Sequence, residues 1–177
     1  MLSWYRDDKL VSKNYDTIES IKTTESVYRL AKVSPLDNKA NFKCNSMNQA
    51  MDSPYSTSIT LSVFYGPDNI KMSGVFEVEV GKQISAICFS EPSNPAPKLR
   101  FTFDGVEYEP SSFASIPTAA SVAVGAYVVN GTFTQTVKHE HNNKELKCYA
   151  ENKAANIIQI VTKQIKVLCK YFQINFQ

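Results

Sequence analysis

Gln83-Ile-Ser-Ala-Ile-Cys-Phe-Ser90 alternates polar with apolar residues and places Cys88 in the apolar series. Glu145-Leu-Lys-Cys-Tyr-Ala-Glu151 has the same alternation, with Cys148 in the equivalent phase. A period of two is typical of a strand that buries one face. We therefore expect two strands that face each other across a core, with both cysteines pointing inward.

Short segments of the same kind recur along the chain, separated by clusters of Asn, Asp, Gly, Ser and Pro. They are rich in Val, Ile, Thr, Phe and Tyr, which favour strands, and no stretch keeps a convincing helical period. The further strands that we expect cover residues 58–65, 75–80, 98–103, 132–139 and 157–167. Many short strands without crossover helices predict an all-β fold, as two stacked sheets or a barrel.

The chain also contains a weak internal repeat, which bears on the number of domains. In both copies Lys precedes a cysteine, and apolar residues follow that cysteine by 17 and 19 positions. The corresponding residues are Trp4 and Phe101, Asp7-Asp8 and Asp104-Gly105, Cys44 and Cys148, Leu61 and Ile165, and Val63 and Val167. Two copies of one unit explain these correspondences.

The two copies are not equally complete. The second has Cys88 upstream of its aromatic residue, whereas the first begins three residues before Trp4. We therefore predict a partial domain over residues 1–66, without its early strands, and a complete domain with a short tail over residues 67–177. The join is expected at Tyr65-Gly66-Pro67, a short stiff break rather than a flexible linker.

Four cysteines allow three complete pairings, and the repeat favours Cys88 with Cys148. A bridge closing that loop would lower the entropy of the unfolded chain and so stabilise the fold by about 4 kcal/mol. It would also indicate an oxidising compartment. The alternative is a pair of reduced core cysteines in a cytosolic sandwich. Cys44 and Cys169 are expected to be unpaired in this fragment. No two cysteines have the C-x-x-C spacing of structural zinc sites.

The residues around Cys88, residues 94–105 and residues 141–152 together resemble an immunoglobulin domain of the CD80-like C2 set. Phe101 stands where that family normally has Trp. Phe42 and Leu146 stand two positions before Cys44 and Cys148, where antibody-type domains have a Tyr. The resemblance implies tandem immunoglobulin-like β-sandwiches, the first truncated at its N-terminus.

The first copy resembles strands C to G of another such domain. Residues 3–10 and 36–44 carry this likeness, and Tyr28, Leu30 and Val33 match strand E.

The order of motifs from residue 63 to 134 is similar to that of nephrin-like immunoglobulin-superfamily cell-adhesion receptors, the nephrin, sticks-and-stones and hibris type. The resemblance implies a cell-surface glycoprotein whose membrane anchor lies outside this chain. It also implies a protein partner, another immunoglobulin-superfamily receptor of the Kirre or Neph type on an opposing cell. In that family contact is implied to involve membrane-distal domains, so these two domains would mainly be spacers.

Two other classes of protein remain open. One is a secreted or membrane-bound immunoglobulin-type immune or ligand-binding protein, and the other is a cytoskeletal sandwich of the muscle type.

The composition is that of a folded protein. The 177 residues are 43% apolar and 20% charged, with a formal net charge of +2, which argues against disorder and against a nucleic-acid binder. The longest apolar runs are shorter than the roughly 20 residues of a membrane span. The residues after Met1 lack the pattern of a secretion signal, so any export signal is absent or lies upstream.

No catalytic or phosphate-binding motif is present, so we expect neither an enzyme nor a cofactor. His139 and His141 flank Glu140, and on a strand they would share a face. A metal site needs a third ligand, however, and none is evident. We therefore interpret this segment as a polar strand end and expect no metal.

Asn130-Gly131-Thr132 is the single N-x-[ST] sequon, a candidate glycan site if the chain is exported. Asn-Gly also favours a hairpin turn, and either interpretation puts Asn130 on the surface. Pro92, Pro95 and Pro97 cannot donate ladder hydrogen bonds and predict a loop between two core strands.

Overall fold

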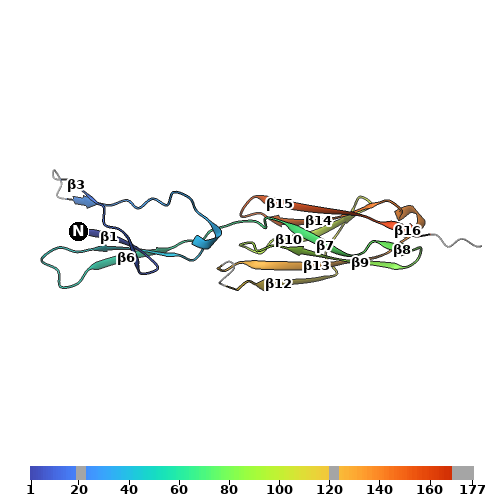
Figure 1. Cartoon of the computed structure of the whole chain (residues 1–177), viewed down its shortest axis with the longest axis horizontal. Coiled ribbons are helices and arrows are strands. Elements are labelled where there is room, and N and C mark those ends of the chain that lie inside the picture. Colours follow the sequence, from blue (N-terminus) through green and yellow to red (C-terminus); the bar gives the residue numbers. More distant parts are fainter. Residues whose placement is uncertain (19–22, 120–123, 169–177) are drawn as a thin grey trace, which may run out of the picture. The chain divides into compact units, whose positions relative to one another are not determined.

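The computed structural model describes residues 1–18, 23–119 and 124–168, and the chain divides into two compact units, residues 1–63 and 64–177. Nearly all of its regular structure is antiparallel strand, as the alternating sequence predicts (Figure 1). The boundary between the units lies three residues before the one expected from the sequence.

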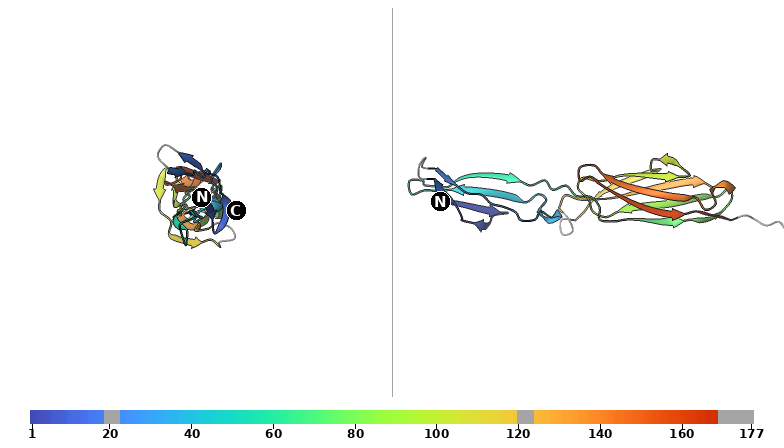
Figure 2. Two further views of the ribbon diagram at one scale, coloured as in Figure 1. Left: turned by 90° about the vertical axis from the view of Figure 1, so that its left-hand side faces the viewer. Right: turned by 90° about the horizontal axis from the view of Figure 1, so that it is seen from above.

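The second unit is a sandwich of two four-stranded sheets (Figures 1 and 2), which confirms the predicted fold. Their strand orders are β12-β13-β9-β7 and β11-β10-β14-β15, and a short parallel pair, β8 and β16, lies beside them. The strands are β7 Ile70–Val75, β8 Glu77–Glu79, β9 Gln83–Ser90, β10 Lys98–Phe103, β11 Val106–Tyr108, β12 Ser112–Pro117, β13 Tyr127–Thr136, β14 Glu145–Asn152, β15 Ile157–Gln164 and β16 Lys166–Leu168.

The core of this sandwich contains the predicted disulfide. Cys88 on β9 and Cys148 on β14 are fully buried and are joined at an S–S distance of 2.07 Å, with their Cα atoms 6.5 Å apart. The two strands belong to different sheets, so the bridge links the two layers. This is the arrangement that the inward phase of both cysteines predicts.

An aromatic cluster fills the rest of the core. The ring of Phe133, on β13, lies 5.5 Å from Phe101, 5.8 Å from Phe103 and 5.3 Å from Tyr108, measured between centroids. The three partner residues come from the opposite sheet. Offset and edge-on contacts of this kind add to the free energy gained by burying the rings.

Residues 65–67, expected to join the domains, pack into the second unit. Tyr65 exchanges two backbone hydrogen bonds with Asn94, at 2.9 and 3.0 Å. The side-chain amide of Asn152, which is buried, donates to the carbonyl oxygens of Tyr65 at 3.0 Å and Pro95 at 2.8 Å. These long-range bonds fix where the second unit begins, and no local sequence signal contains them.

The first unit has a four-stranded sheet of order β2-β1-β5-β6 and a two-stranded sheet, β3-β4. The strands are β1 Leu2–Arg6, β2 Lys9–Ser12, β3 Asp16–Ile18, β4 Thr23–Glu25, β5 Asn41–Ser46 and β6 Tyr55–Thr60.

The expected strand E of the first unit, carrying Tyr28, Leu30 and Val33, is wrong. Residues 26–33 form no ladder with the described part of the chain. In the second unit β13, the expected counterpart, pairs with both β12 and β9. In the first unit the ring of Tyr28 instead packs against the ring of Phe42, with 5.6 Å between their centroids.

Strand register confirms the internal repeat. Trp4 pairs with Cys44 across β1 and β5, and Phe101 pairs with Cys148 across β10 and β14. Both strand pairs are antiparallel, and each aromatic residue is followed three positions later by a turn that begins at an Asp with positive φ.

A side-chain hydrogen bond also recurs in both units. Asn38 accepts a bond from the backbone N–H of Val63 at 2.9 Å, and Asn142 accepts one from Val167 at 2.9 Å. Each Asn precedes its cysteine by six positions, and each acceptor lies in the turn after a short 3-10 helix, η2 Pro35–Asp37 or η3 His139–His141. The two units are therefore built on the same local plan.

Asp37 in the first unit is a buried carboxylate with three donors. It accepts hydrogen bonds from the backbone N–H of Ser34 at 2.7 Å and from the Ser34 hydroxyl at 2.9 Å. Arg6 lies 2.6 Å away as an ion pair. The hydrogen bonds from Ser34, the backbone one first, hold the pKa of Asp37 below the ordinary value, and Arg6 adds to the effect.

Acid is therefore expected to weaken the first unit. Because the pKa of Asp37 is lower in the folded chain, its contribution is fully present above about pH 4 and is lost as the pH falls through the folded pKa. Trp4, the only Trp, reports on this unit in denaturant titrations at several pH values. Asp37→Asn should flatten the loss of stability in acid, whereas the exposed Asp52→Asn should leave it unchanged. An equally steep loss in Asp37→Asn would contradict this prediction.

Candidate protein-contact surface

The outer face of the sheet β10-β14-β15 in the second unit carries a stacked cation and ring. Because Leu99 and Phe101 point into the core, Arg100 between them points out. Its guanidinium lies 3.9 Å from the centroid of the Tyr149 ring on β14, and 3.5 Å from the carboxylate of Glu107. Ring and carboxylate together hold Arg100 in one orientation, so it can bind a partner at little cost in side-chain entropy.

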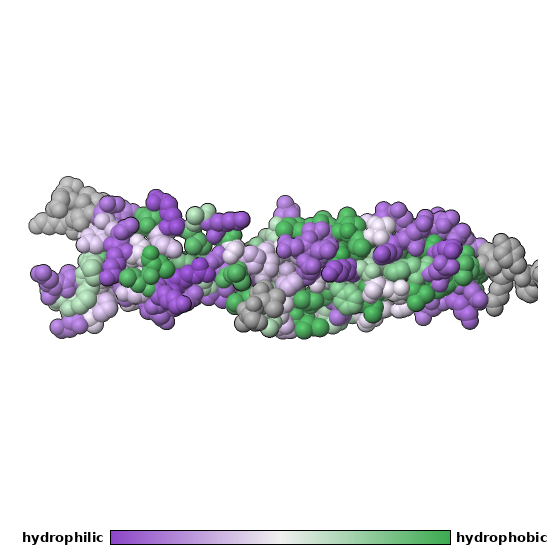
Figure 3. Space-filling view, viewed as in Figure 1, coloured by the Kyte–Doolittle hydropathy of each residue, from purple (hydrophilic) through white to green (hydrophobic). Residues whose placement is uncertain are grey.

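Two exposed isoleucines extend this face across β15. Ile160 lies opposite Tyr149 and Ile158 opposite Glu151 in the strand register. Their side chains are 55% and 53% exposed. Figure 3 shows apolar side chains gathered at the surface over β15. We call Arg100, Tyr149, Ile158 and Ile160 the β15-side surface.

Two ion pairs flank the β15-side surface on the side of β10 and β14. Lys98 bonds Glu109 at 2.9 Å, and Lys147 bonds Glu145 at 3.0 Å. The hydrogen bond to Glu109 raises the pKa of Lys98, and that to Glu145 raises the pKa of Lys147. An apolar and aromatic centre within a charged rim is the usual anatomy of a protein–protein interface.

The sequence analysis did not single out these four residues. Arg100 and Tyr149 occupy the outward phase of strands whose inward phase is apolar, whereas Ile158 and Ile160 lie in a run that has apolar residues in both phases. Arg100 and Tyr149 lie 49 positions apart, and only the register between β10 and β14 places them side by side.

The other sequence-predicted positions lie elsewhere. Cys44 is free and half-buried on β5, and Cys169 lies outside the described residues. Pro92, Pro95 and Pro97 lie in the loop between β9 and β10, as predicted.

His139 and His141 form the short helix η3 instead of a strand end, so they do not share a strand face. The ring of His141 packs edge-on against Phe103 at 4.9 Å, and its Nδ1 accepts a hydrogen bond from the backbone of Lys138 at 3.2 Å. Over residues 1–18, 23–119 and 124–168, no three His, Cys, Asp or Glu side chains are grouped to hold a metal ion.

Asn130 does not form the expected hairpin turn. It lies inside β13, opposite Ala114 of β12 and Phe89 of β9. Gly131 faces the core, where a Cβ atom would come within 3.1 Å of Leu99 and Pro110. A side chain at this position would require Leu99 or Pro110 to shift by a few tenths of an ångström. The two long ladders of β13 override the local preference of Asn-Gly for a turn.

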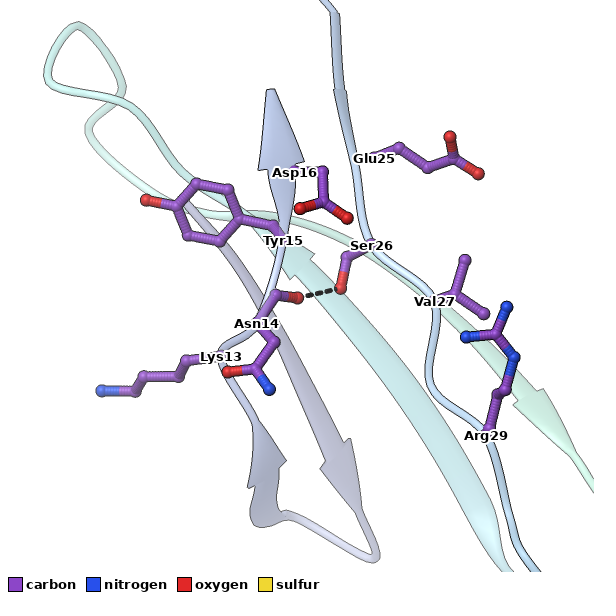
Figure 4. A pocket seen from close by; sticks show the side chains of 8 residues that line it. All are labelled: Lys13, Asn14, Tyr15, Asp16, Glu25, Ser26, Val27 and Arg29. Carbon is purple, nitrogen blue, oxygen red and sulfur yellow. Dashed lines mark hydrogen bonds between the residues drawn. The ribbon is translucent and has the colours of Figure 1, made fainter. Parts of the chain in front are cut away.

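Two of the hollows that described residues line lie in the first unit. A cavity of about 550 Å³ between β3 and the segment after β4 carries charges of both signs and is bounded by Lys13, Asn14, Tyr15, Asp16, Glu25, Ser26, Val27 and Arg29 (Figure 4). The Ser26 hydroxyl donates to the carbonyl of Asn14 inside it.

The second hollow is an apolar pocket of about 210 Å³ on the inner face of the sheet. It is lined by Trp4, Tyr28, Leu30, Phe42, Ile59 and Leu61. Ile59 is 59% exposed there. The corresponding inner face of the second unit is closed by β9 and β13.

Within the described residues, no helix has both the length and the apolar character needed to cross a membrane.

Comparison with known proteins agrees with this architecture. Residues 70–156 match the family described as the CD80-like C2-set immunoglobulin domain. The nephrins of Mus musculus and Rattus norvegicus are each 27% identical to this chain over 149 residues, which is 84% of this chain and 12% of each nephrin. The chain thus spans about an eighth of the length of these relatives.

Two solved structures share the fold. The crystal structure of Rst D1-D2 has a TM-score of 0.70 and 20% identity, covering 96% of this chain and 85% of that one. The full ectodomain (Ig1-Ig3) of mouse nectin-like molecule 4 has a TM-score of 0.60 and 19% identity, covering 76% and 44%. Residues 70–156 therefore form a CD80-like C2-set immunoglobulin domain, and the whole chain is similar to nephrin and has the architecture of tandem immunoglobulin-like sandwiches.

Proposed function

We propose that this chain is part of the extracellular region of a nephrin-like cell-adhesion receptor, and that it acts by recognising a protein on an opposing cell. The observation that carries the proposal is the similarity to nephrin over 149 residues. Neither unit alone is that long, so the similarity runs through both. Such a protein works by surface complementarity and not by catalysis.

The disulfide supports an extracellular location. Cys88–Cys148 is buried and links two sheets, and structural disulfides of this kind persist in oxidising compartments. The receptor would be anchored to the plasma membrane through a segment outside this chain.

The β15-side surface gives the second unit a contact face of its own, beyond the spacer role that the family resemblance implies. Arg and Tyr are enriched among the residues that dominate binding energies, and Arg100 and Tyr149 already contact each other before any partner binds. The partner we propose is another immunoglobulin-superfamily receptor, of the Kirre or Neph type.

We also propose that the first unit is a partial domain. Its Cys44 occupies the register of Cys148, and the apolar pocket over Trp4 lies where β9 and β13 close the second unit. A strand equivalent to β9, from residues outside this chain, would cover this face. On this proposal Cys44 is unpaired only in the fragment, and the partial domain ends at Val63, before the second compact unit begins.

Binding to Kirre- and Neph-type ectodomains tests the proposed contact. The disulfide-bonded chain should bind an immobilised ectodomain, and Arg100→Ala and Tyr149→Ala should each weaken binding about 10-fold or more, as expected for central interface residues. The matched control is Lys71→Ala on β7, an exposed cation in the opposite sheet, which should change affinity less than about twofold.

Binding that is unaffected by both substitutions would contradict the β15-side surface. Failure to bind any such ectodomain would refute contact by this chain and favour the spacer role, or the alternative of a secreted or membrane-bound immunoglobulin-type immune or ligand-binding protein.

A further inference from the structure

We infer that Asn130 carries an N-linked oligosaccharide, and that this oligosaccharide covers the outer face of the sheet β12-β13-β9-β7. The inference uses the extracellular location in the proposed function but does not require the proposed partner. It rests on the sequon, on the orientation of Asn130 and on the apolar character of the surface around it.

The strand alternation points the sequon outward. Along β13, Val129, Gly131 and Phe133 are buried, whereas Asn130 and Thr132 between them are partly exposed. Both functional side chains of the sequon therefore lie on the solvent side of the sheet.

The acceptor amide of Asn130 has no partner in the part of the chain that the structure describes. Its side chain makes no hydrogen bond within residues 1–18, 23–119 and 124–168, in contrast to buried Asn152, whose amide donates to two backbone carbonyls. The Thr132 hydroxyl accepts a bond from Ser112 at 2.9 Å on the same face. A sugar on Asn130 would thus break no bond that holds the sandwich together.

The surface around Asn130 is apolar. Phe89 lies directly opposite Asn130 on β9, and Ile87 lies opposite Thr132. On the other side Ile116 of β12 lies opposite Val128. Phe89 is 38% exposed, Ile87 37% and Ile116 52%.

An exposed apolar patch on an extracellular chain is a liability for aggregation unless something covers it. The first sugar of an N-linked oligosaccharide has an apolar face that packs on an aromatic ring, and the remainder is bulky and strongly hydrated. Phe89 supplies such a ring next to the attachment atom. A sugar here covers this patch and leaves the opposite sheet, with the β15-side surface, open to proteins.

The test is to secrete the full chain from cultured mammalian cells behind an added leader. The intact mass should exceed that of the polypeptide by one oligosaccharide.

Because Asn130-Gly131 can also deamidate spontaneously, the sugar is removed by peptide N-glycosidase in heavy-oxygen water, and a parallel incubation without the enzyme measures the label that spontaneous deamidation introduces. Thr132→Ser should keep the sugar, and Asn130→Gln and Thr132→Ala should lose it. A wild-type chain secreted at its polypeptide mass would overturn the inference.

Cell-free translation with microsomes keeps the test decisive if a variant is not secreted, because sugar is added before folding is complete. A sequon-dependent gel shift supports the inference, and its absence for the wild type overturns it. These outcomes do not depend on partner binding, so they are separate from the test of the proposed function.

The covering role has its own readout. Removing the sugar should raise the fluorescence of an apolar dye about twofold, and Phe89→Ser should abolish most of this rise. The control Ile158→Ser, on the β15-side surface, should leave the rise intact. No rise on deglycosylation would refute the covering role.

Discussion

Replacing both Cys88 and Cys148 by alanine is expected to lower the free energy of unfolding of the second unit by about 4 kcal/mol. The two residues are 60 positions apart, and the bridge removes the entropy of that loop from the unfolded chain. Changing both residues leaves no new thiol in the core that could exchange with another cysteine. Denaturant unfolding under non-reducing conditions, followed by near-ultraviolet circular dichroism, measures the loss.

Cys44→Ala is the matched control. Cys44 pairs in register with Trp4 as Cys148 pairs with Phe101, but it is free and only half-buried. Its removal should change the stability of the second unit by less than about 0.5 kcal/mol. Equal unfolding midpoints for the double alanine variant and the wild type would show that the bridge does not stabilise the sandwich.

Phe133→Ala is expected to destabilise the second unit by about 4 kcal/mol, because it removes the ring that touches three others and leaves a cavity between the sheets. The control is Phe113→Ala on β12, where the ring is 53% exposed and a small change is expected. Chemical denaturation of both variants measures the difference. Similar losses for the two would mean that the aromatic cluster is not the centre of the core.

The sequence predicted β9 and β10 with their ends as the structure has them, because strict alternation stops at proline-rich or turn-forming residues on either side. It also predicted the disulfide, since both cysteines stand in the inward phase of their strands. The alternation of polar and apolar residues is a local signal, and it recurs in each of these strands.

The predictions that were wrong have a common physical cause. In each case the local structure depends on pairing with residues that are distant in the sequence. Asn130-Gly131 has the local preference of a turn, but ladders to β12 and β9 make it strand. Residues 26–33 have the composition of a strand but lack a ladder partner in the described chain. Tyr65 belongs to the second unit through hydrogen bonds with Asn94 and Asn152.

The β15-side surface could not be found from the sequence for a related reason. A polar residue in an alternating strand is ordinarily only a solvated position. Arg100 becomes a candidate for recognition once the strand register sets it over Tyr149 beside exposed Ile160.

Disulfide mapping of the natural protein tests most directly whether this chain works outside the cell as an immunoglobulin-type receptor. The protein would be taken from its own cells, alkylated at once and digested without reduction. We expect mass spectrometry to find the peptides containing Cys88 and Cys148 joined to each other. Recovery of both cysteines as alkylated free thiols would contradict an extracellular receptor and would favour an intracellular sandwich of the muscle type.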